Sequence, residues 1–140
     1  MSVYLDASVL LTIVVKEPGS DAINQFLEEV DTTVWVSEFA SAEVASALSR
    51  LLRMKNLSLR NAQDRLAAFD DWIAADANLV DVEGVDVRLA ARFVRRFDLM
   101  LRAPDALHLA MCRRLNATIA TLDRRLAVAA QALDIPVASL

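Results

Sequence analysis

Two acidic residues stand at places where strands of an α/β fold would end. Asp6 and Asp123 each follow a short apolar run directly. Carboxylates that converge repel one another, so a group of them either takes up protons or binds a hard cation. Oxygen ligands suit Mg²⁺ and Mn²⁺, and such ions activate water for attack on a phosphodiester. If these two acids converge with others in the folded chain, the site that they form is suited to metal-assisted hydrolysis of a phosphodiester.

Two further acids fall on expected helices. Asp105 follows Pro104 in the first turn of one helix, and Glu43 lies inside another. Taken singly, Asp6, Asp105 and Asp123 have a simpler interpretation, because an Asp after a strand often caps the next helix. Glu43 differs, because the residues three and four positions away from it include no cation. A half-buried carboxylate there needs a compensating cation from elsewhere.

Apolar runs and helical spacings alternate along the whole chain. Strands are expected at 3–5, 33–36, 79–82, 118–122 and 135–138, and helices at 7–15, 20–30, 38–55, 59–75, 86–97, 104–115 and from Asp123 onward. This alternation predicts an α/β domain with a parallel sheet and right-handed crossovers. Ligands of open α/β sheets bind outside the carboxyl ends of the strands, which is where Asp6 and Asp123 fall.

Composition limits the class of protein. The chain has 140 residues, 56% of them hydrophobic, with 2 Gly and 3 Pro, which is typical of one ordinary globular domain. The single cysteine, Cys112, cannot form an intrachain disulfide, so a reducing compartment is expected. The apolar run 7–15 is too short to span a bilayer and has no basic segment before it. We therefore expect a cytoplasmic protein with no membrane association.

Four segments of the chain resemble PIN-domain ribonucleases, and within that family VapC-type toxins of prokaryotic toxin–antitoxin pairs. The resemblance covers almost the whole chain in the right order. Its first and third segments are the specific ones. In order, the segments are VYLDASVL at 3–10, SAEVASAL at 41–48, RAPDALHLA at 102–110 and TLD at 121–123.

The resemblance implies a fold, an activity and partners. The fold would be one PIN domain over residues 1–140, with a parallel sheet of order 3-2-1-4-5 and helices on both faces. The activity would be Mg²⁺- or Mn²⁺-dependent endoribonuclease cleavage of a structured RNA such as tRNA or rRNA. The partners would be a cognate VapB-type antitoxin, which inhibits the toxin, and a second copy of the chain in a homodimer or a higher assembly with the antitoxin.

Matching positions also imply roles for individual residues. Asp6 and Asp105 would bind the principal ion, while Glu43 and Asp123 would complete the site and position the attacking water. Hydroxyl groups that often accompany these acids match Thr121 and Ser8, and Arg102 is a candidate for contact with the scissile phosphate. For His108, the only histidine, the sequence favours a structural role.

The charge balance alone argues against a nucleic-acid partner. The net charge is −4, although 13 of the 15 cations are Arg and the half after residue 80 is net +2. Because four of the 19 acids would belong to one metal site, one bound divalent ion moves the net charge to −2 and two move it to 0. The acidic balance therefore does not exclude RNA.

Other classes fit less well or stay open. A haloacid-dehalogenase-type phosphatase needs an Asp two residues after Asp6, where Ser8 stands, and a receiver domain needs a second acid beside Asp6 and a late Lys. The alternative that stays open is a catalytically silent PIN-fold module that only binds partners. The expected hairpin of helices 38–55 and 59–75 could receive an antitoxin helix in its outer groove. Trp35 and Trp72 are expected in the core or lining that groove.

Overall fold

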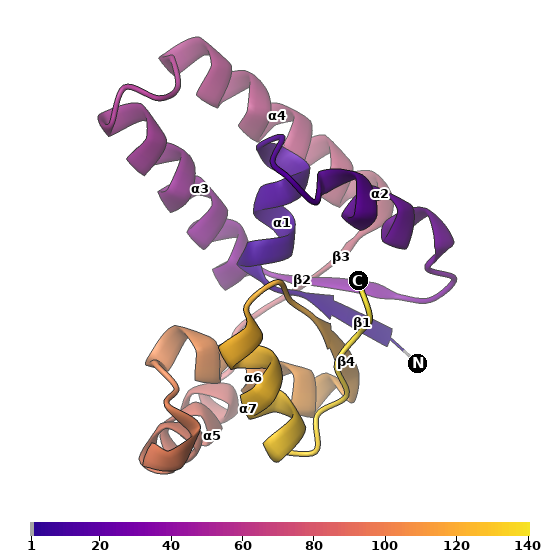
Figure 1. Ribbon diagram of the computed structural model, residues 1–140, viewed down its shortest axis with the longest axis vertical. Helices are drawn as coiled ribbons and strands as arrows, with labels where there is room; N and C mark the ends of the chain where they lie inside the picture. Colours follow the sequence, from indigo (N-terminus) through magenta and orange to yellow (C-terminus); the bar gives the residue numbers. More distant parts are fainter. Residues whose placement is uncertain (1) are drawn as a thin grey trace.

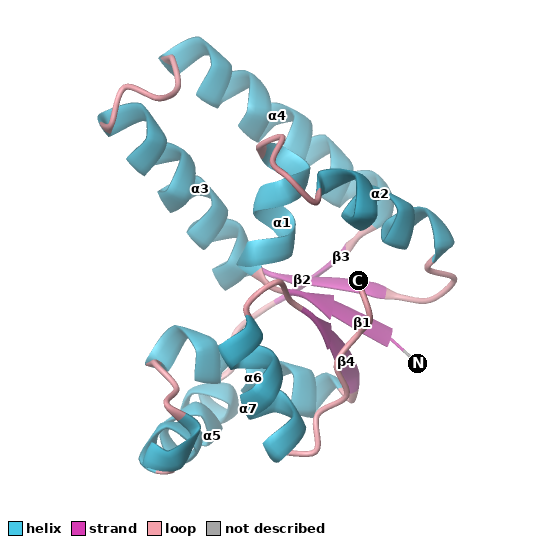
Figure 2. Cartoon of the chain, viewed as in Figure 1, coloured by secondary structure: helices cyan, strands magenta, loops and turns pink. Residues whose placement is uncertain are grey.

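A parallel sheet of four short strands forms the centre of the chain, and helices pack on both of its faces (Figures 1 and 2). The structure is a computed structural model that describes residues 2–140. In chain order the elements are β1 (Ser2–Leu5), α1 (Ala7–Val14), α2 (Ser20–Glu29), β2 (Val34–Ser37), α3 (Glu38–Arg53), α4 (Leu59–Asp76), β3 (Asn78–Val80), α5 (Gly84–Arg95), the short 3-10 helix η1 (Phe97–Leu99), α6 (Ala103–Leu115), β4 (Ala117–Ala120) and α7 (Arg124–Ala132).

The strand order is β3-β2-β1-β4, and every neighbouring pair is parallel. This confirms the predicted α/β class and the predicted order of the first four strands. The predicted fifth strand, 135–138, is reduced to one isolated bridge between Ile119 and Val137, beside β4 as expected. Pro136 lies next to the bridge and has no N–H to donate to a ladder, which limits the pairing.

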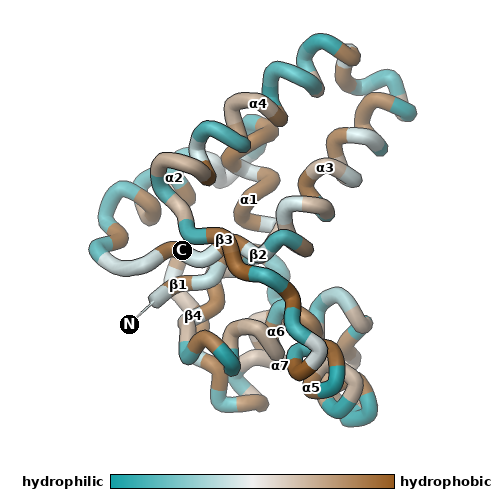
Figure 3. The backbone as a smooth tube through the Cα atoms, turned by 180° about the vertical axis from the view of Figure 1, so that it is seen from behind, coloured by the Kyte–Doolittle hydropathy of each residue, from teal (hydrophilic) through white to brown (hydrophobic). Residues whose placement is uncertain are grey.

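The two faces of the sheet bury two different cores, because side chains alternate along a strand. On β1, Tyr4 faces the core formed with α5, α6 and α7. Val3 and Leu5 face the opposite core, formed with α1 to α4. We call these the α5–α7 lobe and the α1–α4 lobe. Helix α1, coloured mostly hydrophobic in Figure 3, lies in the middle of the second lobe. The tryptophans divide likewise, since Trp35 packs against the first core and Trp72 against the second.

Helices α3 and α4 form the predicted hairpin, which we call the arm. Ser37 begins α3 by accepting a hydrogen bond from the Ala40 N–H at 2.9 Å. Ala40, Val44 and Leu48 recur every four residues and are buried, so one side of α3 faces the α1–α4 core. Both helices then extend away from the sheet, and the turn that joins them is at the corner of the molecule farthest from the α5–α7 lobe (Figure 1).

An ion pair ties α5 to α6 in the other lobe. Arg114, near the end of α6, donates to the two carboxylate oxygens of Asp86 at 2.8 and 2.9 Å and to the Asp81 carbonyl at 2.9 Å. The sequence predicts that α5 begins at Asp86, but it begins at Gly84. The reason is a capping box, in which the Asp86 carboxylate accepts the Glu83 N–H at 2.8 Å from within the first turn.

Across residues 2–140, none of the helices combines the length and the apolar character that a membrane span requires.

Candidate active site

Asp6 lies at the carboxyl end of β1, where it caps α1, and it is only 4% exposed. Its Oδ1 accepts hydrogen bonds from the Ser8 hydroxyl at 2.6 Å and from the Val9 N–H at 3.2 Å, and its Oδ2 accepts one from the Thr121 hydroxyl. Burial raises the pKa of Asp6 above its ordinary value, and these hydrogen bonds together with the charge of His108 oppose the rise. Asp6 is therefore a buried carboxylate that three donors hold in a fixed orientation.

Hydroxyl groups join the loop after β4 to the start of α1. Thr121 follows β4 and accepts the Asp123 N–H at 3.0 Å, while the Ser8 hydroxyl accepts the Leu122 N–H at 2.9 Å. Asp123 in turn caps α7, and its Oδ1 accepts two backbone N–H groups of that helix at 2.9 and 3.2 Å. Because β1 and β4 are neighbours, Asp6 and Asp123 follow adjacent strands at the same edge of the sheet.

Glu43 lies one and a half turns into α3, and its partner is His108 of α6. His108 Nε2 donates to Glu43 Oε1 at 2.5 Å, and the two side chains are 4% and 30% exposed. The other ring nitrogen, Nδ1, lies 2.6 Å from the Tyr4 hydroxyl, which is also 2.8 Å from Ser37 Oγ. The buried imidazole thus joins the end of β2, the middle of β1 and the exposed rim of α3.

Tyr4 carries a buried hydroxyl that interacts electrostatically with two of the acids. Burial raises the pKa of Tyr4 well above its ordinary value, and the negative charges of Asp6 and Glu43 raise it further. Both carboxylates therefore act on the same buried hydroxyl. The Phe39 ring closes this region on the α3 side, with its centroid 5.5 Å from that of His108.

Asp105 lies in the first turn of α6, one turn before His108. Its side chain is 25% exposed, and its Oδ2 lies 3.9 Å from Arg102 Nε. Arg102 is 87% exposed and makes no shorter ionic contact among the residues described. Asp105 is thus held only loosely, in contrast to Asp6, and Arg102 is free to turn toward a phosphate.

The structure therefore places the predicted residues around one edge of the sheet. Asp6, Ser8, Thr121 and Asp123 form one connected hydrogen-bonded group. Glu43 belongs to a second hydrogen-bonded group, with His108, Tyr4 and Ser37, and Asp105 precedes His108 on the same helix. Between residues 2 and 140, however, no three His, Cys, Asp or Glu side chains gather closely enough to enclose a metal ion.

That arrangement suits one kind of metal and argues against another. Structural zinc takes four closed ligands rich in Cys and His, whereas the one cysteine, Cys112, is buried, and burial raises the pKa of its thiol well above the ordinary value. Mg²⁺ keeps several waters and takes one or two carboxylates together with phosphate oxygens of the substrate. Asp6 and Asp105 supply carboxylates of that type, so the donor set fits Mg²⁺ or Mn²⁺ held partly by water.

His108 is the residue of this region that the sequence undervalues. The need of Glu43 for a partner is visible in the sequence, because no cation stands three or four residues away on its helix. The partner comes from 65 residues further along the chain, which helical spacing cannot reveal. The usable signal is that the chain has a single histidine, three residues after Asp105.

Comparison with known proteins agrees with the fold. The family model for the PIN domain matches residues 3–132. The chain belongs to the PIN domain family. It is 32% identical over 139 residues to Ribonuclease VapC46 of Mycobacterium tuberculosis, a match that covers 97% of this chain and 95% of the relative.

Solved structures share the same architecture at low sequence identity. One is VapC20 of Mycobacterium tuberculosis, described as a Sarcin-Ricin loop cleaving toxin, with a TM-score of 0.73, 15% identity and coverage of 91% of this chain and 94% of that one. Another is VapBC2 of Rickettsia felis bound to a DNA fragment of its promoter, with a TM-score of 0.74, 16% identity and coverage of 99% and 98%. At these identities the likeness extends to the fold.

Proposed function

We propose that this chain is a divalent-metal-dependent endoribonuclease that hydrolyses phosphodiester bonds of a structured RNA, either tRNA or rRNA. It would act as the toxin of a type II pair with a VapB-type antitoxin. The observation that carries the proposal is the position of Asp6 and Asp123 after the neighbouring strands β1 and β4, with Glu43 bonded to His108 on the helix whose first turn holds Asp105. The 32% identity to a protein named a ribonuclease supports the same activity.

In this mechanism Asp6 and Asp105 would hold a Mg²⁺ or Mn²⁺ ion. When bound, the ion supplies a water of lowered pKa and neutralises charge that develops on the phosphate. Ser8 and Thr121 keep the Asp6 carboxylate fixed by hydrogen bonds. Glu43, whose Oε1 is held by His108, would position the attacking water together with Asp123. Arg102, exposed beside Asp105, contacts the scissile phosphate.

The partners follow from the same assignment. Three solved structures of the same fold support this assignment: one from Klebsiella pneumoniae is described as a toxin–antitoxin complex, and the others are named VapBC2 of Rickettsia felis and VapBC-1 of Haemophilus influenzae. We expect this chain to form a homodimer, or a higher assembly with its antitoxin. The second candidate function is a catalytically silent PIN-fold module that binds the antitoxin alone, and it differs from the first only in activity.

The decisive experiment compares two substitutions, each of which replaces an Asp carboxylate by the uncharged amide of Asn. Purified protein would be incubated with total tRNA or rRNA and Mg²⁺, and the new RNA ends sequenced. Asp105→Asn should lower the cleavage rate by at least about 100-fold, the scale of loss when one positioned catalytic group is removed. Asp98→Asn is the matched control, because Asp98 is an exposed acid paired with Arg96 in η1.

The result also separates the two candidate functions. Equal cleavage by Asp105→Asn and Asp98→Asn would remove Asp105 from the site. Absence of cleavage by the unaltered chain, together with tight antitoxin binding, would favour the silent module. Calorimetry of Mg²⁺ binding by the unaltered chain and by Asp6→Asn tests the metal separately, since only the former should show the saturable heat of a site.

A further inference from the structure

We propose that the tip of the arm binds the phosphate backbone of the RNA substrate, at a distance from the acidic residues that would cleave it. The tip consists of the last turns of α3, the first turn of α4 and the turn between them, with the cations Arg50, Arg53, Lys55 and Arg60. This inference rests on the proposed function for the identity of the ligand as RNA. The evidence for it is the charge, the position and the solvent exposure of the cations at the tip.

The charge of the tip and the helical turns next to it is opposite to that of the rest of the chain. Residues 44–63 carry four cations and no Asp or Glu. Since the whole chain has 15 cations and 19 acids, the other 120 residues carry 11 cations and 19 acids, a net charge of −8. The sequence places the basic excess in the half after residue 80, but the longest stretch of cations free of acids lies here. Local positive potential, and not bulk charge, governs contact with phosphates.

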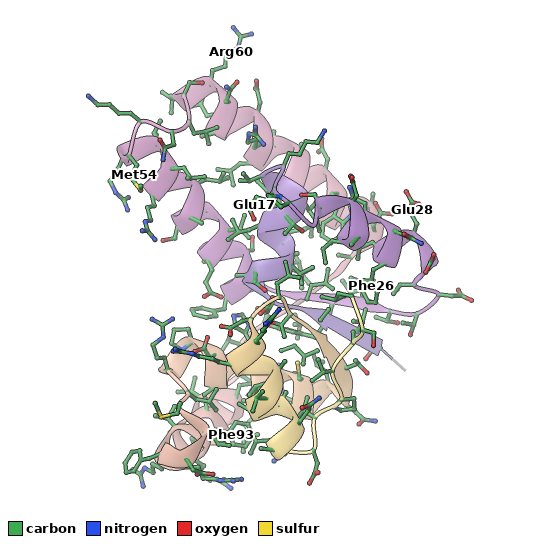
Figure 4. All side chains as sticks on the ribbon, in the orientation of Figure 1. Glu17, Phe26, Glu28, Met54, Arg60 and Phe93 are labelled. Carbon is green, nitrogen blue, oxygen red and sulfur yellow. The ribbon has the colours of Figure 1, made fainter. Side chains whose placement is uncertain are left out.

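All four cations of the tip are exposed to solvent. Arg53 donates to Ser49 Oγ at 2.7 Å, and no acidic side chain within residues 2–140 forms an ion pair with any of the four. Figure 4 shows Arg60 pointing outward from the end of the arm, with Met54 at the neighbouring corner. Cations used for internal stability would instead be paired with acids, as Arg114 is in the other lobe.

Helix electrostatics explains only part of the pattern. Arg50 and Arg53 lie in the last turn of α3, where a cation interacts favourably with the helix dipole. Arg60, however, is the second residue of α4, where the dipole disfavours a cation and an acid would be expected. Lys55 lies in the turn and belongs to neither helix. Two of the four cations therefore have no local stabilising role.

A surface hollow on α3 extends from Glu43 of the candidate active site to two of the four cations, Arg50 and Arg53. It has a volume of about 280 Å³, and its lining residues run along one stripe of α3: Glu43, Ser46, Ala47, Arg50 and Arg53. At a rise of about 1.5 Å per residue, Arg50 lies about 10 Å and Arg53 about 15 Å along the helix from Glu43. A strand with its scissile phosphate near Glu43 can thus continue along α3 toward the tip.

The test measures RNA binding separately from cleavage. All proteins would carry Asp105→Asn, which keeps the RNA intact, and fluorescein-labelled tRNA would be titrated by anisotropy in Mg²⁺ at several KCl concentrations. Adding Arg50→Gln and Arg53→Gln should weaken binding about tenfold. It should also lower the slope of log K against log salt by roughly 0.7 to 0.9 for each lost phosphate contact.

The matched control is Arg92→Gln with Arg95→Gln. These two exposed arginines have the same spacing and also lie in the last turn of a helix, α5 in the opposite lobe. This control changes the net charge and the charge at a helix end by the same amount as the Arg50 and Arg53 substitutions do. Because it lies away from the arm, it should leave the salt slope close to that of the parent protein. Equal effects of the two pairs would overturn the inference, because only bulk charge would then matter.

Two further outcomes separate this inference from the proposed function. If the chain without Asp105→Asn cleaves tRNA, and the arm substitutions alter neither cleavage nor binding, the activity stands and the arm inference fails. If the chain without Asp105→Asn does not cleave tRNA, the nuclease proposal fails. If Arg50→Gln with Arg53→Gln nevertheless lowers RNA affinity more than the control substitutions do, the arm remains an RNA-binding surface. Loss of antitoxin binding with unchanged RNA binding would assign the arm to the protein partner and overturn the inference.

Discussion

The two lobes bury polar groups of different kinds. In the α5–α7 lobe the buried groups can carry charge: Asp86, 1% exposed, is paired with Arg114, and His108, 3% exposed, is bonded to Glu43. Within the helices of the α1–α4 lobe they are hydroxyls that bond backbone carbonyls, as Thr12 does to Val9 at 2.7 Å and Ser20 does to Thr12 at 3.0 Å. Asp6, also buried, lies at the sheet edge, where it bonds both the start of α1 and the loop after β4. The α5–α7 lobe thus buries an ion pair, whereas the α1–α4 lobe carries four exposed cations at the end of the arm.

This difference teaches how the chain divides its tasks. A buried ion pair gives little net stability, but it is costly to break on one side only. The α5–α7 lobe therefore fixes the orientation of α6, which carries Asp105 and His108. The α1–α4 lobe depends on apolar packing, so its surface charges are available to a ligand. Each prediction below tests one side of this comparison.

The largest expected effect comes from breaking the buried pair. Arg114→Ala leaves the Asp86 carboxylate buried without its cation, so we expect a loss of about 3–5 kcal/mol in the free energy of unfolding. Chemical denaturation would measure it. A second substitution, Asp86→Leu, should recover most of the loss, because it removes the unpaired charge. Failure of the double variant to recover would mean that packing, and not charge, links α5 to α6.

Leu48→Ala is the corresponding change in the other lobe. Leu48 is 1% exposed in the α1–α4 core, and truncating a buried Leu costs about 2–5 kcal/mol. Here the lost contacts are apolar, so the cost should not depend on salt concentration. A strong salt dependence in denaturation would contradict the division between the lobes.

A smaller effect is expected at the contact between the lobes. His108→Gln keeps a donor that can reach Glu43 but loses the bond to Tyr4, so we expect a destabilisation of about 1 kcal/mol. His108→Leu leaves Glu43 without its partner and should lower the cleavage rate more than His108→Gln does. In the unaltered chain, where His108 is the only histidine, imidazole nitrogen resonances would show directly whether its bonds to Tyr4 and Glu43 form. Equal rates for the two variants would show that Glu43 needs no partner.

The smallest effect concerns Asp6 and pH. Because burial raises the pKa of Asp6 above 3.8, the folded protein binds this proton more tightly than the unfolded chain does. The stability contributed by protonated Asp6 is complete below pH 3.8 and is lost as the pH rises through the folded pKa. Asp6→Asn should therefore lose less stability than the unaltered chain as the pH rises toward neutrality. Thermal unfolding in EDTA at a series of pH values would measure the difference.

Local sequence signals predicted much of the fold. Asp6 and Ser37 each cap a helix directly after a strand, and both helices begin where the sequence places them. The prediction was less accurate where contacts distant in sequence decide. Asp86 looks like the start of a helix, but it lies inside α5 because Glu83 and Arg114 share its carboxylate.

The candidate site, too, could be predicted from the sequence only in part. That acids follow β1 and β4 can be read from the sequence, since β1 ends at Leu5 directly before Asp6 and β4 ends at Ala120, three residues before Asp123. The partner of Glu43 could not be read, because His108 is 65 residues away. The same holds for the cations of the tip, which look like ordinary helix-end charges until the arm is seen to extend from the molecule (Figure 1).

The shortened pairing beyond β4 has a consequence for how the protein behaves at high concentration. Strand edges with free backbone groups can pair with a second molecule and begin aggregation. At β4 the Ile119 N–H is bonded to the Pro136 carbonyl at 2.9 Å, and the Ile119 carbonyl accepts the Ala138 N–H at 2.8 Å. Two hydrogen bonds from the end of the chain thus occupy this edge and shield it from other molecules.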